Sequence, residues 1–253
     1  MSENPMRGYS AEGTTREYAA AEPGQLVMPF YLLCDVSFSM SDDMPALNEG
    51  IQRLRRAIVS EPAVDDVAHI GILTFADKAK VVMPLGQMSE HGVPALSVAG
   101  GTDYGAAFRV LAQTITQDTA NLKAQGYKVY RPCAFFLSDG APLDRDWEET
   151  FRATLTYDPG TGVGMKGHPI FIPYGFRDAP EKVLRKLAYP MGRARWYHCK
   201  SADIEDALKG ILDNIMNTVI TSGSSASSGQ PALVQQAPAA DSGIAWGDPD
   251  PWV

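Results

Sequence analysis

Apolar runs alternate with amphipathic segments along most of this chain, a pattern typical of an α/β protein. Residues 27–34, VMPFYLLC, are almost wholly apolar, as expected for a parallel strand that is buried on both faces. Residues 44–58 carry apolar side chains at spacings of three and four, which predicts a helix with one buried face. The runs 68–75 and 79–85 are separated by only Ala76, Asp77 and Lys78, so we expect an antiparallel hairpin there.

The alternation continues through the second half of the chain. Helices are expected around 108–115, 147–155, 183–187 and 204–219, and strands within 131–140, 169–176 and 194–199. The whole pattern predicts an α/β fold with a doubly wound, mostly parallel six-stranded sheet, one antiparallel edge strand and helices on both faces. In such sheets ligands bind outside the carboxyl ends of the strands, where the strand order reverses.

The two ends of the chain differ from this central part. Residues 1–26 are polar and show no periodicity, so we expect a flexible leader before an α/β domain at 27–220. Residues 221–253 are rich in Ser, Gly, Ala and Pro and contain no Lys or Arg. Such a segment buries too little apolar area to offset the entropy of ordering, which predicts a disordered acidic tail. Its end, WGDPDPWV, is either a docking motif with aromatic anchors or an unimportant terminus.

Charge and cysteine content narrow the function classes. The net charge of −8 argues against nucleic acid or an anionic membrane as the partner. The N-terminus has no hydrophobic signal core, and no apolar run is long enough to cross a bilayer. Cys34, Cys133 and Cys199 are far apart, without a CxxC pair, so we expect free thiols, buried at Cys34 and Cys133. These features predict a cytoplasmic protein.

Hydroxyl and carboxyl groups gather at three places where ligands are expected. Asp35, Ser37 and Ser39 follow the first strand at alternate positions, Thr102 precedes a helix, and Asp139 ends a later strand. The carboxyl ends of neighbouring strands lie side by side, so these groups can converge on one oxygen-rich spot. Oxygen ligands without His or Cys suit a hard cation, Mg²⁺ first and Mn²⁺ or Ca²⁺ as alternatives.

The Asp-x-Ser-x-Ser pattern resembles the first motif of the metal-ion-dependent adhesion site (MIDAS) of von Willebrand factor A domains. The resemblance covers residues 27–220, and its site residues are Asp35, Ser37, Ser39, Thr102 and Asp139. It implies that the hydroxyls ligate the metal and that the acids act directly or through water. It also implies that a partner protein donates an Asp or Glu carboxylate to the metal. The chain departs from the family at Phe38, where Gly is usual.

Three longer stretches point to a subgroup of that family. YLLCDVSFSM, GGTDYGAAF and FLSDGAPLDRDW are most similar to bacterial tellurium-resistance proteins of the TerY type. Such proteins accompany a Ser/Thr protein kinase and a metal-dependent protein phosphatase. The resemblance therefore implies a non-enzymatic scaffold or adaptor in a bacterial signalling or stress system. The loops around the metal, including Phe38, Asp42, Asp103 and Leu143, would supply contact area.

Simpler interpretations exist for each motif. Ser37 and Ser39 alone would be read as helix caps, and Asp139-Gly140 alone as a turn. Their joint occurrence at three strand ends favours the metal site. GVGMKG at 162–167 matches a dinucleotide fingerprint by letter, but it follows a helix and precedes a strand. It is better interpreted as a loop or a small hairpin.

The alternative function is a Mg²⁺-dependent phosphoryl-transfer enzyme on a similar sheet. That reaction would require Asp35 as nucleophile and an acid two residues later, where this chain has Ser37. The four histidines are scattered, and no general base is evident near the proposed cation. A third hypothesis makes the tail the functional end, with WGDPDPWV docking elsewhere or on a neighbouring molecule.

Overall fold

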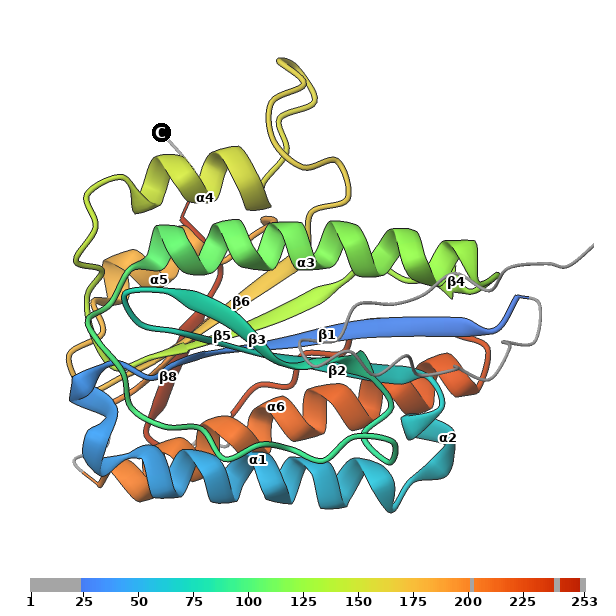
Figure 1. Cartoon of the computed structure of the whole chain (residues 1–253), viewed down its shortest axis with the longest axis horizontal. Coiled ribbons are helices and arrows are strands. Elements are labelled where there is room, and N and C mark those ends of the chain that lie inside the picture. Colours follow the sequence, from blue (N-terminus) through green and yellow to red (C-terminus); the bar gives the residue numbers. More distant parts are fainter. Residues whose placement is uncertain (1–23, 201–202, 239–241, 251–253) are drawn as a thin grey trace, which may run out of the picture.

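A single eight-stranded sheet organises the chain (Figure 1). The computed structural model describes residues 24–200, 203–238 and 242–250. The strands are β1 (Leu26–Asp35), β2 (Ala68–Phe75), β3 (Ala79–Gly86), β4 (Lys128–Val129), β5 (Cys133–Ser138), β6 (Ile170–Phe176), β7 (Trp196–Cys199) and β8 (Ile244–Gly247). The helices are η1 (Phe38–Asp42), α1 (Met44–Val59), α2 (Pro62–Asp65), α3 (Tyr104–Ala124), α4 (Trp147–Leu155), α5 (Glu181–Leu187) and α6 (Ile204–Ser227).

The strand order is β3-β2-β1-β5-β6-β7-β8, with β4 pairing with β1 beside this path. The pairs β1–β2, β1–β5, β5–β6 and β6–β7 are parallel, whereas β2–β3 and β7–β8 are antiparallel. The predicted mostly parallel α/β sheet and its β2–β3 hairpin are confirmed. The sheet has eight strands where six were predicted, because the two-residue β4 is too short to detect and β8 comes from the tail.

Helices cover both faces of the sheet, as predicted. In Figure 1, α3 and α4 lie on one face, and α1, α2 and α6 lie on the other. Successive residues of β1 enter the two cores alternately: Phe30 and Leu32 pack with side chains of α1 and α6. Tyr31 and Leu33 pack with those of α3 and α4. This double burial explains why the first strand is apolar at nearly every position.

Helices α1 and α6 approach closely at Gly50. A Cβ atom on Gly50 would lie 2.0 Å from Cδ1 of Leu212, so the absence of a side chain permits this contact. Leu212 is buried, with 2% of its surface exposed. The middle of α1, the helix that follows the first candidate metal loop, is therefore packed closely against α6.

The C-terminal segment differs from the disordered tail that the composition predicts. Helix α6 continues to Ser227, past the expected boundary at residue 220. Ile244–Gly247 then pair with β7 as an antiparallel edge strand. The indole N–H of Trp196 donates to the carbonyl of Asp248 at 3.0 Å, and the Arg195 guanidinium lies 4.5 Å from the centre of the Trp246 ring. Most of the expected leader, 1–23, and the final residues 251–253 lie outside the described residues.

Three smaller predictions can also be compared with the structure. The cysteines are free and buried. Tyr157 and Gly164 form an antiparallel bridge, so the segment with the dinucleotide-like letters is a small hairpin. Across the described ranges, every helix is too short or too polar to span a bilayer.

Candidate functional site

Three segments meet at the carboxyl edge of the central strands. The backbone N–H of Phe38, after β1, donates to the carbonyl of Gly100 at 3.1 Å. The N–H of Leu143, after β5, donates to the carbonyl of Thr102 at 2.9 Å. The loop before α3 is thus bonded to the loop after β1 on one side and to the loop after β5 on the other.

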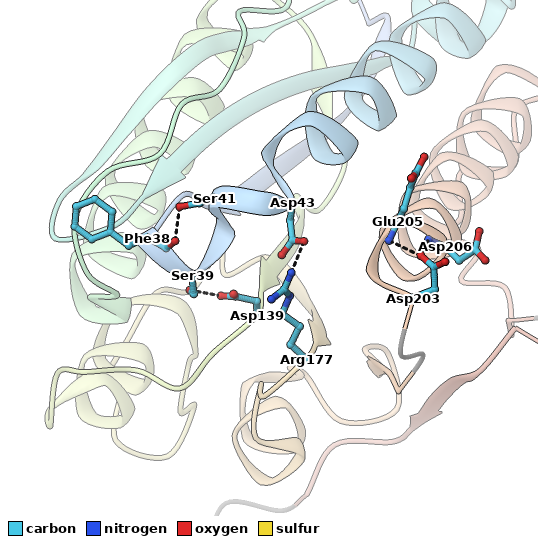
Figure 2. A network of polar contacts seen from close by, with 9 residues as sticks. All are labelled: Phe38, Ser39, Ser41, Asp43, Asp139, Arg177, Asp203, Glu205 and Asp206. Carbon is cyan, nitrogen blue, oxygen red and sulfur yellow. Dashed lines mark hydrogen bonds and ion pairs between the residues drawn. The ribbon is translucent and has the colours of Figure 1, made fainter.

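Four of the five predicted metal-site residues form one hydrogen-bonded chain. The Oγ atoms of Ser37 and Ser39 are 3.1 Å apart. The Ser39 hydroxyl donates to Oδ1 of Asp139 at 2.9 Å, across a hundred residues of sequence (Figure 2). The backbone N–H of Ser37 donates to Oδ1 of Asp35, also at 2.9 Å.

Thr102, the fifth residue, joins the site through its backbone. Its carbonyl accepts the bond from Leu143, and only 8% of the residue is exposed. Its side chain makes no hydrogen bond to any other residue that the structure describes. The Thr102 hydroxyl therefore keeps its oxygen lone pairs available.

Asp35 is the buried support of the first loop. Its Oδ2 accepts the Ser138 hydroxyl at 2.7 Å, and its residue surface is fully buried. The hydroxyl of Tyr104 lies 2.9 Å from Ser138 Oγ and 2.8 Å from the carbonyl of Gly140. Burial raises the pKa of Asp35 to about 6, against the lowering effect of bonds from Ser37 and Ser138. Both oxygens of Asp35 are thus engaged, which suits it to position the loop.

Asp139, at the end of β5, contacts the loop after β1 and the loop after β6. Burial raises its pKa, while the bond from Ser39 opposes that shift. The negative charge of Asp43 raises the pKa further, and the positive charge of Arg177 lowers it. The Asp139 carboxylate therefore interacts with charged groups from two other loops.

Further acids hold the loop that carries Thr102. Gly100 has φ +53°, and a Cβ atom there would lie 2.1 Å from Oδ2 of Asp77. Oδ1 of Asp77 accepts the N–H of Gly101 at 2.8 Å. Asp103 and Asp144 both accept backbone N–H groups of the first turn of α3. Sequence reasoning missed Asp77 and Asp144, because only the tertiary fold brings them to this loop. It also gave no supporting role to Ser138 and Tyr104, although each lies within two residues of a predicted site residue.

The structure contradicts the helix-cap interpretation of the serines. Ser37 precedes η1 and Asp43 precedes α1, yet neither side chain caps its helix. The hydroxyls of Ser37 and Ser39 instead face each other, and that of Ser39 also reaches Asp139. The alternating serines therefore have a tertiary role.

An ion pair borders the site on the side of β6. Nη2 of Arg177 donates to Oδ1 of Asp43 at 2.6 Å (Figure 2). Asp43 is 3% exposed, and its Oδ2 has no partner among the described residues. The N–H of Asp178 donates to the carbonyl of Asp139 at 3.1 Å, which ties this loop to the end of β5. No sequence motif marked Arg177.

A cavity of about 790 Å³ opens beside this ion pair. It lies between the N-terminal ends of α1 and α6. Figure 2 shows acidic side chains at both helix ends, Asp43 at α1 and Asp203 and Glu205 at α6. Its charged lining consists of Asp42, Asp43, Glu49, Asp203, Glu205 and Arg177. In Figure 2, Phe38 lies on the side of the site away from α6; it is 71% exposed, and Leu143, in the loop after β5, is 73% exposed. The site thus has an apolar rim on one side and an acidic cavity on the other.

The oxygen positions fit a hard divalent cation. Two oxygens at right angles on Mg²⁺, each at about 2.1 Å, lie about 3 Å apart. The Ser37–Ser39 and Ser39–Asp139 oxygen distances, 3.1 and 2.9 Å, are hydrogen-bond lengths and are also compatible with such an edge. No group of three or more His, Cys, Asp or Glu suited to a metal occurs in the described part of the chain. The five predicted site residues include only two acids, and their other donors are hydroxyl groups. Their role in metal binding stays a prediction.

Comparison with known proteins agrees with the fold. A family model described as the von Willebrand factor type A domain matches residues 30–141, which include all five predicted site residues. The pilus adhesin SpaC from Lactobacillus rhamnosus GG, in its open conformation, is 15% identical, with a TM-score of 0.54, over 78% of this chain and 31% of that chain. A search of curated proteins gave no match.

A mussel protein gives a similar result. Proximal thread matrix protein 1 from the mussel byssus is 15% identical, with a TM-score of 0.50, over 79% of this chain and 49% of that chain. Another structure of it has zinc in its MIDAS motif, with 15% identity, a TM-score of 0.49 and the same coverage. This chain thus spans about half the length of the mussel protein. The sheet order described above, together with the family-model match, identifies the fold as the Rossmann-like fold of von Willebrand factor A domains.

Proposed function

We propose that this chain is a non-enzymatic protein-interaction module that depends on a divalent cation, with Mg²⁺ as the expected ion. The observation that carries the proposal is the hydrogen-bonded chain from Ser37 through Ser39 to Asp139. It gathers oxygen donors from segments far apart in sequence at the sheet edge where ligands of doubly wound folds bind. A family resemblance of the same residues supports the same function.

Each residue would have a distinct part in holding the cation. The hydroxyls of Ser37, Ser39 and Thr102 would be direct ligands, and Asp139 would act directly or through water. Asp35, whose oxygens accept bonds from Ser37 and Ser138, would keep the first loop in place. When bound, the cation would supply a Lewis-acidic position for an outside carboxylate. Neutral hydroxyls leave part of its charge uncompensated, which favours an anionic partner group.

The apolar rim would add contact area around that charged centre. Phe38 and Leu143 are large and mostly exposed, and exposed aromatic side chains commonly anchor protein interfaces. Phe38 stands where the resembling family has Gly, between the two serines. We therefore propose that a partner's Asp or Glu meets the cation while its neighbouring apolar side chains contact Phe38 and Leu143.

The biological setting is proposed from the sequence resemblance. The TerY-like stretches suggest a cytoplasmic bacterial scaffold in a tellurium-resistance or related stress system. A Ser/Thr protein kinase and a metal-dependent protein phosphatase are the partners that this resemblance suggests.

Cation titration tests the first half of the proposal. Mn²⁺ binding would be measured by electron paramagnetic resonance, with Mg²⁺ as competitor, for the wild type, Asp139→Asn and Ser39→Ala. We expect one site in the wild type and a loss of affinity of at least about tenfold in both variants, since each removes a ligand or a charge. Asp66→Asn, on an exposed acid away from the site, is the matched control. Equal affinities in all four proteins would contradict the proposal.

Affinity capture from the native cell tests the second half. Wild type and Asp139→Asn would be compared with and without a chelator. Partners lost both with the variant and with the chelator are the expected result. A partner set that neither treatment alters would rule out a cation-bridged interaction.

A further inference from the structure

We propose that Arg177 couples the two binding events at this site, so that the cation binds tightly only together with an acidic ligand. This inference rests on the proposed function and deepens it. In this arrangement the cation is held only weakly in the absence of a partner.

The first observation is the position of the Arg177 charge. Its guanidinium lies between Asp43 and Asp139 (Figure 2). It bonds to Asp43, and the N–H of the next residue, Asp178, bonds to the carbonyl of Asp139. A positive charge is thus built into the edge of the donor set, where it repels an incoming cation.

The second observation is the backbone conformation of Arg177. Its φ is +51°, and among the described residues no other non-glycine residue has a positive φ. This left-handed region is unfavourable for a residue with a Cβ atom. The surrounding structure therefore fixes Arg177 in an unfavourable conformation, as is often found at functional sites.

The third observation is that the guanidinium keeps donors for a further group. Arginine has five N–H donors, and the described contacts of Arg177 use one, to Oδ1 of Asp43. The side chain is 31% exposed, whereas that of Asp43 is 3% exposed. The buried acid therefore holds one side of the guanidinium while another side faces the solvent.

These observations predict opposite effects on the two ligands. A cation alone meets the like charge of Arg177, which weakens its binding. A carboxylate is attracted both to the cation and to Arg177, so its arrival offsets that repulsion. Removing the Arg177 charge should therefore tighten binding of the cation alone and reduce the gain from a carboxylate.

The experiment measures Mn²⁺ affinity with and without acetate as the carboxylate probe, on the full chain. For Arg177→Gln we expect Mn²⁺ alone to bind about fivefold tighter than in the wild type, as for a single charge several ångström from the ion in high dielectric. Acetate should increase the Mn²⁺ affinity of the wild type. In Arg177→Gln the factor by which acetate increases that affinity should be several times smaller. Arg177→Lys keeps the charge and should resemble the wild type.

Arg53→Gln is the matched control, since Arg53 also pairs with an acid, Asp213 at 3.2 Å, and is 30% exposed. It should leave both affinities unchanged. If Arg177→Gln does not fold by circular dichroism, Asp43→Asn takes its place. That variant leaves the guanidinium uncompensated and should weaken binding of Mn²⁺ alone.

The outcomes separate the two proposals. Equal or weaker Mn²⁺ binding in folded Arg177→Gln, or the same change in Arg177→Lys, would overturn the role of Arg177 while leaving the cation site intact. An acetate effect of equal size in both proteins would also overturn it. A wild type that binds no Mn²⁺ would overturn the proposed function itself.

Discussion

Substitution of Gly50 by alanine tests the close contact between α1 and α6. Alanine is favoured over glycine inside a helix by about 1 kcal/mol. The new Cβ atom, however, would lie 2.0 Å from Cδ1 and 3.2 Å from Cγ of Leu212, so that side chain must move. Overpacking a buried contact costs about 1–3 kcal/mol. We expect the clash to prevail and Gly50→Ala to lower the free energy of unfolding by about 1 kcal/mol.

Gly210 in α6 provides the matched control. A Cβ atom there would lie 3.4 Å from Cδ1 of Ile244, an ordinary van der Waals contact. Gly210→Ala should therefore gain the helical preference and stabilise the protein by about 1 kcal/mol. Urea denaturation followed by circular dichroism would compare the two variants. Stabilisation by both substitutions would refute the reasoning, because it would mean that Leu212 accommodates the methyl group without cost.

Two further predictions concern pH dependence and the tail. Burial lowers the pKa of His69 from 6.5 to about 4, so the folded state favours the neutral ring, and this contribution to stability is lost as pH falls from 6.5 towards 4. Between pH 7.5 and pH 4, the free energy of unfolding measured by urea denaturation should fall by about 3 kcal/mol more in the wild type than in His69→Gln. An equal fall in the two proteins would disprove this. Deletion of residues 242–253 removes β8 and should lower Tm by about 5 °C. Mn²⁺ affinity should not change, since no hydrogen bond joins β8 to the candidate site in the described structure; an altered affinity would refute this separation.

Sequence patterns predicted the parts of the molecule that depend on local periodicity. Burial on both faces makes β1 apolar throughout, and one-sided burial gives α1 its three-and-four spacing, so both could be read directly. Asp35, Ser37 and Ser39 were recognisable because their alternation is a property of one short segment.

Other features depend on contacts between distant segments. Arg177 forms an ion pair with Asp43, and Asp144 accepts a backbone N–H at the start of α3. The sequence around Arg177 and Asp144 contains no motif that predicts these contacts. The tail strand was missed for a different reason. The Ser/Gly/Pro-rich residues around it predict disorder. Pairing with β7, however, uses the backbone N–H and C=O groups, and every residue except proline has both. The apolar Ile244 and Ala245 then pack against the core.

The antiparallel strands at both ends of the sheet also affect how copies of this chain meet in a crowded solution. A parallel sheet with open edges would offer long rows of free backbone groups to another molecule, a route to aggregation. Here the outermost strands are poor templates. Strand β3 carries Lys80 and Pro84, and proline has no N–H to donate to a neighbour. Strand β8 is only four residues long. Edge-to-edge stacking of sheets from two copies of the chain is therefore disfavoured at both sides of the sheet.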